Sequence, residues 1–573
     1  MKKPTILKTE RVDDIPLLLA QLERMGVQEL LDQHFPTHGN WQGLSLGQVA
    51  IVWLSHILSQ ADHRMNQVQS WAEQRIESLG IILGQEVRAL DLSDDRLESV
   101  LFNLSKNESW SSFEQALSQR QLQVYDLKPE RVRLDSTSVS GFWDENKEGL
   151  FRYGHSKDHR PDLPQMKLMM ATLDPLGLPI ASEIVAGNSA DDPLYEPAIA
   201  QVRKTLGQRE MLYVGDCKMG SIGTRYFIQA GNDYYLCPLS KTQVRTEELT
   251  KYVAESKEAG IELENISYAY ANGKTVVIAK GYEQVYSCSL KHEKEEISWS
   301  ERRLIVYSIA HGQSQKQALQ SRIETAQKNL ELLNQNRLGK KPSKDFQEFI
   351  QAAEEIIKKN RVQSLFNVSF TEDIEQIHQR KYKERPAGVI EKRTFQVKYT
   401  IESDKVEQQM ELLGWRVYAT NHPEKELSLA DAVVAYRQEY LIEHCFGRLK
   451  GQPLSLRPMF LQREDHIKGL MRLLSIGLRL LTLVEFQVKR ALEVDKSKLE
   501  GIYSGNPRRA TAQPTTERLL ANFKEITMVF IALGTEIYTE LTTLNPLQQR
   551  ILQLLNFPID IYIRLSSQSD DPP

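Results

Sequence analysis

Apolar residues recur at intervals of three and four over the first 128 residues, which is the periodicity of an amphipathic helix. The pattern covers residues 15–35, 44–76 and 92–122, and the last of these stretches opens with Ser and Asp residues that suit a helix N-terminus. We therefore expect a helical N-terminal region. It contains no glycine-rich phosphate-binding loop, so both a recognition domain and a structural bundle fit it.

The pattern changes to strand-like alternation at Arg131, and strands and helices then alternate as far as residue 240. Three strands in succession form a meander, which is followed by helix, strand, helix and strand. This order predicts an α/β fold with a ribonuclease H-like mixed sheet, in which the fourth strand can lie beside the first. The predicted strands cover residues 131–141, 165–174, 178–187, 211–216 and 232–240, and the predicted helices cover residues 191–206 and 220–231.

A long segment, residues 241–394, interrupts this sheet. Its first half is strand-like, and its second half predicts a helical hairpin around the turn GKKP at 339–342. Strand patterns resume after it, followed by one helix over residues 427–451 and further helices to about residue 495.

Composition favours a soluble globular protein, because 41% of the 573 residues are hydrophobic and 26% are charged. The four cysteines form no CxxC pair, which argues against a disulfide framework and a cysteine-rich zinc site. The most apolar run, residues 469–486, contains Arg472 and Arg479, so we interpret it as a buried amphipathic helix and expect no membrane segment. The first residues have no apolar core of a signal peptide, so we expect a cytoplasmic protein.

The net charge of −4 is the wrong sign for a simple nucleic-acid binder. The segment from Glu443 to Arg490 is nevertheless locally basic, with nine Lys or Arg against four Asp or Glu. A chance basic helical surface and a phosphate-binding patch both fit this count.

Three acidic residues stand at the ends of elements that the predicted sheet can bring together. Asp135 follows an apolar strand, Asp216 ends a second one, and Glu443 lies on a helix that returns to the sheet. Such an oxygen-rich site suits Mg²⁺ or Mn²⁺, and two ions about 4 Å apart can support in-line phosphoryl transfer. Taken singly, an Asp that closes a strand is more often a turn or capping residue.

The stretch AYRQEYLIEHCFGRLKG, residues 435–451, places Tyr436, Glu443 and Lys450 seven residues apart. Seven residues make nearly two helical turns, so the three side chains share one face of a single predicted helix. That face is either a solvated surface or one wall of an active site.

These blocks resemble those of DDE transposases from bacterial insertion sequences, in the group called insertion sequence family four. Members carry a helix with Tyr, Arg, Glu and Lys at fixed spacing, and Tyr436, Glu443 and Lys450 fall on that pattern. The arginine position holds Glu439, for which Arg437 or Arg448 could supply the missing cation. The resemblance identifies Asp135, Asp216 and Glu443 as the catalytic acids and ligands of two Mg²⁺ or Mn²⁺ ions.

The resemblance also implies contacts with DNA. Lys450 and Tyr436 would contact backbone phosphates, and the interval of 227 positions from Asp216 to Glu443 would hold an insertion domain that shapes the DNA-end pocket. Trp299 is then a candidate for stacking on an unpaired base, although a core aromatic of a hairpin fits equally well. The motif GHSKDHRPDLPQ contributes four further candidate phosphate contacts, for which a polar surface loop is the alternative: His155, Lys157, His159 and Arg160.

We therefore expect a transposase that cleaves the terminal inverted repeats of its own element and joins their 3′ ends to target DNA, working as a homodimer in a synaptic complex near the nucleoid. A decayed or domesticated transposase that only binds DNA is the first alternative, and a related nuclease is the second. The expected regions are a DNA-binding N-terminal domain at 1–128, two parts of the catalytic domain at 129–240 and 395–495, the insertion at 241–394 and a helical C-terminal region at 496–573.

Overall fold

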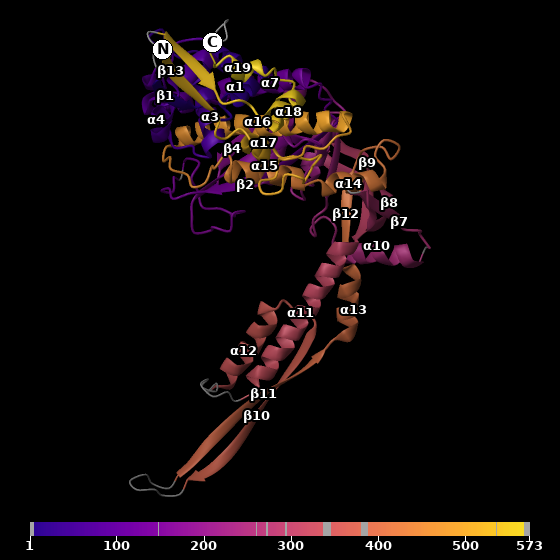
Figure 1. Ribbon diagram of the computed structural model, residues 1–573. Coiled ribbons are helices and arrows are strands. Elements are labelled where there is room, and N and C mark those ends of the chain that lie inside the picture. Colours follow the sequence, from indigo (N-terminus) through magenta and orange to yellow (C-terminus); the bar gives the residue numbers. More distant parts are fainter. Residues whose placement is uncertain are drawn as a thin grey trace. The chain divides into compact units, whose positions relative to one another are not determined.

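The computed structural model describes residues 5–146, 148–258, 260–270, 273–292, 295–335, 345–379, 388–533 and 536–566 (Figure 1). Contacts divide the chain into two compact units. Unit 1 comprises Met1–Cys237 and Ala435–Pro573, and unit 2 comprises Pro238–Val434. Unit 1 is therefore built from two separate stretches of chain, and the five-region division expected from the sequence remains a prediction.

The N-terminal part of unit 1 is mainly helical, which confirms the helices predicted from apolar spacing. Ser45 begins one of them with a capping box, in which its side chain accepts a hydrogen bond from the Gln48 amide while the Gln48 side chain accepts one from the Ser45 amide. The helices are α1 (Ile15–Arg24), α2 (Val27–His34), α3 (Leu46–Gln60), α4 (Val68–Glu73), α5 (Ile76–Leu83), α6 (Asp94–Leu104) and α7 (Asn107–Val124).

A small sheet joins the two ends of unit 1, and the sequence patterns did not predict it. Strand β1 (Thr5–Arg11) pairs antiparallel with β13 (Thr527–Leu533), which pairs with β14 (Glu536–Leu541). The same C-terminal region contains the expected helices α17 (Thr516–Ala521), α18 (Pro546–Leu554) and α19 (Asp560–Ile563). Pairing between residues more than 500 positions apart leaves no local periodicity from which to predict it.

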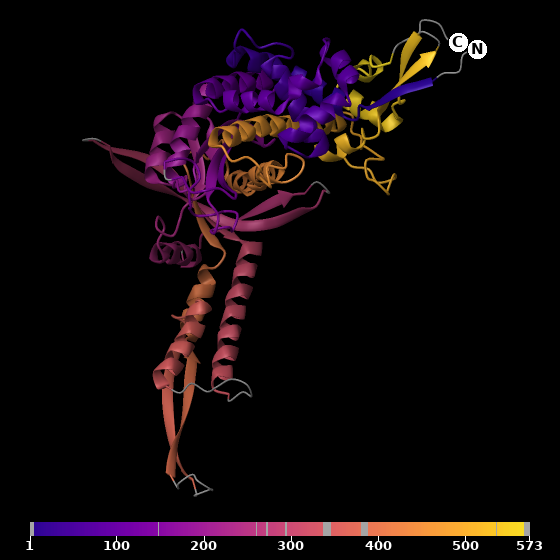
Figure 2. The ribbon, with the colours of Figure 1, turned by 90° about the vertical axis from the view of Figure 1, so that its left-hand side faces the viewer.

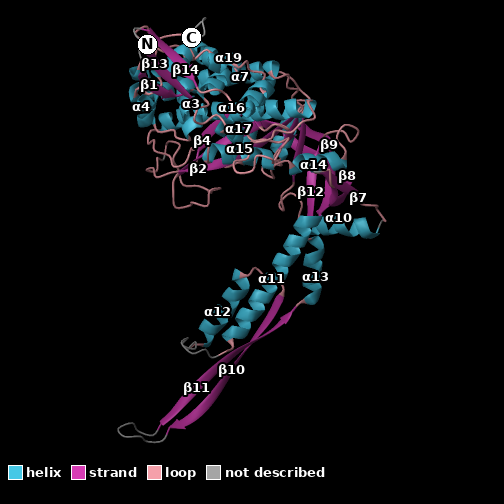
Figure 3. Cartoon of the chain, in the orientation of Figure 1, coloured by secondary structure: helices cyan, strands magenta, loops and turns pink. Residues whose placement is uncertain are grey.

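The large sheet of unit 1 is mixed, as its element order predicted. Its strands are arranged in the order β4-β3-β2-β5-β6, with an antiparallel meander β2–β3–β4 and with β5 parallel to both β2 and β6. Figure 3 labels β2 and β4 of this meander. The predicted position of the fourth strand beside the first is thus confirmed. The elements are β2 (Arg131–Ser140), β3 (Gln165–Leu173), β4 (Leu178–Ala186), α8 (Tyr195–Leu206), β5 (Leu212–Val214), α9 (Ile222–Ala230) and β6 (Tyr234–Pro238).

The helix α16 (Glu464–Val494) runs through unit 1 and packs on α6, α3 and strand β4 (Figure 1). Its buried Arg479 pairs with the buried Glu114 of α7 at 3.3 Å, which confirms an amphipathic core helix. Gly469 allows the close approach to α6, because a Cβ there would lie 2.1 Å from the Leu101 carbonyl oxygen. Among the described residues, no helix is long and apolar enough to cross a bilayer.

The predicted helix over 427–451 is in fact two helices, α14 (Leu429–Arg437) and α15 (Tyr440–Lys450). Arg133 of β2 supplies a reason for the break, because its guanidinium donates hydrogen bonds to the carbonyls of Ala435 (2.7 Å) and Tyr436 (3.4 Å). Carbonyls satisfied in this way end α14 at the sheet. Tyr436 therefore lies on one helix, and Glu443 and Lys450 lie on the next.

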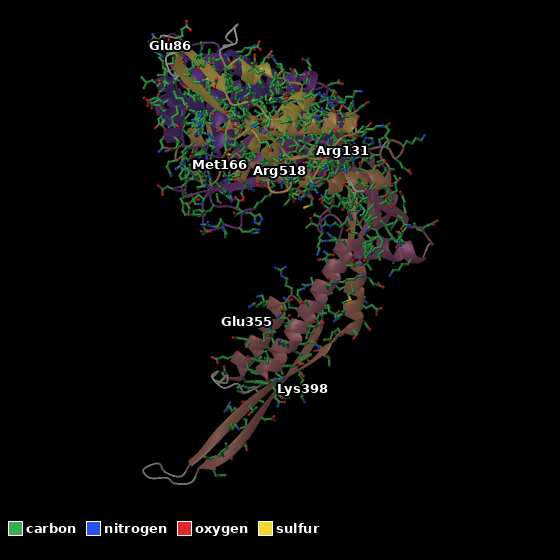
Figure 4. All side chains as sticks on the ribbon, in the orientation of Figure 1. Glu86, Arg131, Met166, Glu355, Lys398 and Arg518 are labelled. Atoms are coloured by element: carbon green, nitrogen blue, oxygen red, sulfur yellow. The ribbon has the colours of Figure 1, made fainter. Side chains whose placement is uncertain are left out.

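Unit 2 contains strands in the order β12-β9-β8-β7 and a separate two-stranded ribbon, β10–β11. Helices α11 and α12 pack against the part of this ribbon that contains Phe366 and Val397, and the ribbon extends past them (Figure 2). In Figure 4, the label Glu355 marks helix α12 and the label Lys398 marks strand β11 of the ribbon. The bounds are α10 (Thr246–Glu258), β7 (Glu264–Ala269), β8 (Thr275–His292), β9 (Glu295–Ser308), α11 (Ile309–Leu333), α12 (Phe346–Lys359), β10 (Phe366–Gln379), β11 (Gly388–Ile401), α13 (Ser403–Leu412) and β12 (Trp415–Thr420).

Candidate active site

Asp135 and Asp216 lie at the same level of two adjacent parallel strands: Asp135 is inside β2, which continues to Ser140 and so does not end there as expected, and Asp216 lies just beyond the end of β5. In the register of β2 and β5, Arg133 is paired with Val214, and each aspartate lies two residues beyond its member of this pair. Burial raises the pKa of the Asp135 carboxyl, and the charge of Asp216 raises it further, while Lys157 opposes the shift. The two acids that the sequence placed at one sheet edge are therefore close enough to repel each other.

Asp216 is held by the turn that follows its strand and by α8. Its Oδ1 accepts a hydrogen bond from the Tyr195 hydroxyl at 2.7 Å and another from the Lys218 amide at 2.8 Å. Burial raises the pKa of Tyr195 well above its usual value, and the nearby carboxylates raise it further, so this hydroxyl remains a donor. Tyr195 was missed by the sequence analysis, because it lies on an ordinary amphipathic helix.

Lys157 provides the cation nearest to Asp135. Its Nζ lies 3.3 Å from Asp135 Oδ1 and donates to the carbonyl (2.7 Å) and the hydroxyl (2.9 Å) of Ser136. Lys157 was expected to contact a DNA phosphate. Its ammonium binds the middle of β2 and neutralises the first predicted catalytic acid.

Asp191 extends this polar network to the next strand. Its Oδ1 accepts hydrogen bonds from Lys167 Nζ at 2.8 Å and Ser136 Oγ at 3.2 Å, and its Oδ2 lies 4.0 Å from Lys157 Nζ. Burial alone would raise the pKa of Asp191, but the hydrogen bond from Lys167 and the charges of Lys157 and Lys167 keep this pKa below its usual value. The network fixes Ser136, the neighbour of Asp135 on β2.

The third acid position involves two glutamates. Glu443 of α15 is exposed and lines a cavity of 1190 Å³ that also contacts Tyr440 and Lys489. Glu439, which precedes α15, is partly buried. Burial raises the pKa of Glu439, and Asp135, Glu443 and Asp216 raise it further. The residue that departs from the family pattern therefore belongs to the same acidic cluster, which the sequence analysis missed because it treated this position as a lost arginine.

The donor chemistry of this cluster fits a hard divalent cation. Carboxylate oxygens are the preferred ligands of Mg²⁺, and the mutual repulsion of Asp135, Asp216 and Glu439 is what a bound cation would relieve. Across the described part of the chain, however, no three His, Cys, Asp or Glu side chains are gathered into a metal-binding group. The residues thus match such a metal in kind, while their oxygens do not form a complete ligand set.

Lys450 is turned toward β2 and the loop after it. Its Nζ donates to Thr137 Oγ1 at 2.6 Å and to Asp158 Oδ1 at 2.8 Å. Burial lowers the pKa of Lys450 to about 8, and Lys157 lowers it as well, whereas Asp135 opposes the shift. The contact with Asp158 is favourable to the charged form, so Lys450 is a half-buried ammonium with two partners.

The other residues assigned to DNA lie in different surroundings. Arg448 is buried in ion pairs with Glu485 and Glu517, the latter at 2.7 Å. Arg160 forms a bidentate contact with Asp162 at the surface. Tyr436 is buried, Arg437 is half-buried, His155 and His159 are exposed, and Trp299 is buried in unit 2 opposite Cys288.

Comparison with known proteins gives two family matches. The family described as "Transposase DDE domain" matches residues 127–480, which is more than half of the chain, and a "Domain of unknown function" matches residues 7–117. No curated protein sequence matches the chain. Among solved structures, a cryo-EM structure of a piggyBac transposase synaptic complex with hairpin DNA is similar at a TM-score of 0.33 and 9% identity, over 91% of this chain and 81% of that one.

Proposed function

Because this chain belongs to the Transposase DDE domain family, we propose that it cleaves the ends of a bacterial insertion sequence and joins them to target DNA. Asp135, Asp216 and Glu443 are the proposed catalytic acids. The observation that carries the assignment is the parallel register of β2 and β5, with both aspartates two residues beyond the same pair. We further propose that the mixed sheet is of the ribonuclease H type and that the group is insertion sequence family four.

The proposed chemistry is metal-dependent phosphoryl transfer, with Mg²⁺ or Mn²⁺ held by the three acids. Two such ions would activate the attacking oxygen and stabilise the leaving oxygen. The protein supplies the fixed carboxylates, and Tyr195 and the Lys218 amide leave Asp216 Oδ2 for a ligand by occupying Oδ1. Lys157 holds Asp135 in place at 3.3 Å.

Terminal inverted repeats and target DNA are the proposed partners, and a homodimer is the proposed working assembly. The exposed His155 and His159, in the loop beside the site, are the best placed of the assigned phosphate contacts. Arg448 is better explained as a structural residue, because its guanidinium is buried against two glutamates.

A nicking assay tests this function directly. A duplex carrying the terminal repeats is incubated with the full-length protein and Mg²⁺, and the variants Asp135→Asn and Asp216→Asn are compared with wild type. The matched control is Asp162→Asn, an exposed acid of the neighbouring loop whose partner is Arg160. We expect loss of nicking by at least about 100-fold in the first two variants only, as for removal of a group acting in the transition state.

One observation favours the non-cutting alternative, a domesticated DNA-binding protein. Glu439 adds a fourth negative charge where the family has a cation, and Lys157 already neutralises Asp135. Specific binding of the terminal-repeat duplex without nicking in either Mg²⁺ or Mn²⁺ would establish this alternative and overturn the first.

A further inference from the structure

The loop between β2 and β3 carries two adjacent residues of opposite charge, Lys157 and Asp158, that attach to different elements of the site. We propose that Asp158 is a positioning residue, which fixes the C-terminal end of α15 against β2 and so sets the distance between Glu443 and Asp135. This inference rests on the proposed function, because it concerns the same acids.

Asp158 pairs with two cations, one at the end of α15 and one in the segment that follows α15. Its side chain is 6% exposed, its Oδ1 accepts a hydrogen bond from Lys450 Nζ at 2.8 Å, and its Oδ2 pairs with Arg457. Lys450 is the last residue of α15, and Arg457 lies in the segment that follows. One buried carboxylate therefore ties both the end of the helix and the chain beyond it to the loop.

Lys157 attaches the same loop to β2. Its backbone amide donates to Ser138 Oγ at 2.9 Å, while its ammonium binds Ser136 and Asp135. Because Lys157 and Asp158 are consecutive, a shift of one moves the other. The loop is thus fastened to the strand of the first acid and to the helix of the third acid.

The hydroxyl residues that follow Asp135 gain a role from this arrangement. Ser136 and Ser138 anchor Lys157, Thr137 accepts a hydrogen bond from Lys450 at 2.6 Å, and Ser140 contacts Arg457 at 3.4 Å. Alternate residues of a strand point to opposite faces. The strand therefore fastens the loop through Ser136 and Ser138, and the end of α15 through Thr137.

Two roles for Lys450 can be separated. If Lys450 and Arg457 are reserved for a DNA phosphate, Asp158 occupies their site in the free protein, and its removal should strengthen DNA binding. If Asp158 is a brace, its removal leaves two half-buried cations without their carboxylate and releases α15 from β2. The 6% exposure of the Asp158 side chain and the second bond from Lys450 to Thr137 favour the brace.

Asp158→Asn tests the proposal in the full-length protein, with Asp162→Asn as the control from the same loop. We measure the Mg²⁺ concentration for half-maximal nicking, the dissociation constant for a terminal-repeat duplex and the unfolding midpoint. We expect the half-maximal Mg²⁺ concentration to rise about tenfold, as when groups that orient metal ligands are lost, while DNA affinity stays close to wild type. The unfolding midpoint should fall, because two half-buried cations lose their carboxylate. Tighter DNA binding with an unchanged Mg²⁺ requirement would overturn the brace, and so would no change in any of the three.

Hydrogen exchange of the free protein gives a readout that needs neither DNA nor metal. Asp158→Asn should speed amide exchange at the end of α15 and in β2, where Asp162→Asn should not; equal rates would overturn the proposal. If wild type does not nick DNA but the exchange result holds, the proposed function fails and the brace stands. Should Asp158→Asn not fold, Thr137→Val removes one anchor of Lys450 with almost no change of shape, and the same expectations apply to it.

Discussion

The Tyr195 hydroxyl lies 2.7 Å from Asp216 Oδ1 and orients the second acid of the proposed site. Tyr195→Phe removes this donor and leaves Asp216 Oδ1 with the hydrogen bond from the Lys218 amide. We expect the free energy of unfolding to fall by about 1 kcal/mol, the usual net value of a hydrogen bond. Nicking should fall because the Asp216 carboxylate is free to rotate, and single-turnover kinetics at saturating Mg²⁺ would measure this. Unchanged turnover would show that the Lys218 amide alone orients Asp216.

The pH dependence of Lys450 offers a second prediction. Burial lowers its pKa to about 8, below its ordinary value of 10.5, so the folded protein binds this proton less tightly than the unfolded chain. The cost to stability is fully present below pH 8 and is relieved as the pH rises from about 8 toward 10.5. The unfolding free energy of wild type should therefore rise across this range relative to Lys450→Met, as measured by urea denaturation at each pH. Parallel curves for the two proteins would contradict the shifted pKa.

Arg448 should prove to be a stability residue. Its guanidinium is 6% exposed and pairs with Glu485 and Glu517, so Arg448→Met takes this cation from Glu517 and leaves Glu485 paired with Lys489. Breaking a buried pair by removing one partner costs about 3–5 kcal/mol of unfolding free energy, which urea denaturation can measure. The salt dependence of DNA binding should not change, because no phosphate contact is lost. A shallower salt slope would restore Arg448 to the DNA interface.

Replacing two helical glycines by alanine should change stability in opposite directions, because Gly469 lies where α16 crosses α6 and Gly447 has open space beside it. Gly469→Ala places a Cβ 2.1 Å from the Leu101 carbonyl oxygen, and such overpacking costs about 1–3 kcal/mol. Gly447→Ala on α15 meets nothing within 4 Å and should stabilise the protein by about 0.5–1 kcal/mol, because alanine favours a helix. Thermal unfolding of the two variants gives the comparison. Equal shifts would mean that the helices move apart to accept the methyl group.

The sheet of unit 1 could be predicted well from the sequence because its strands have recognisable local patterns. Alternation marks β2, β3 and β4, and the element order leaves few positions for β5, so Asp135 and Asp216 could be placed at one edge. The helix break at Gln438 and Glu439 could not be predicted, because it depends on Arg133, some 300 residues away. Local periodicity describes one continuous helix there.

The functional side chains differ in the same way: some can be recognised from local sequence, and others only from contacts with distant residues. An acid that follows a strand, such as Asp216, can be recognised from its position, whereas a loop residue such as Asp158 cannot be told from any exposed polar residue until its partners are known. Arg448 is the opposite case. It was expected to contact DNA, but its guanidinium forms ion pairs with two glutamates that lie far from it in the sequence. Charge patterns predict which residues can bind a phosphate, and only tertiary pairing decides which are available.

The pairing of β1 with β13 has a consequence for biosynthesis. Thr5 lies opposite Ala532, so β1 has no pairing partner until more than 500 further residues have been translated. Until then the backbone of β1 is an unpaired edge, and its Ile6 and Leu7 are exposed even after it pairs, so the segment can associate wrongly with other chains. Synthesis that stalls within unit 2 would therefore release a nascent chain with that edge uncovered.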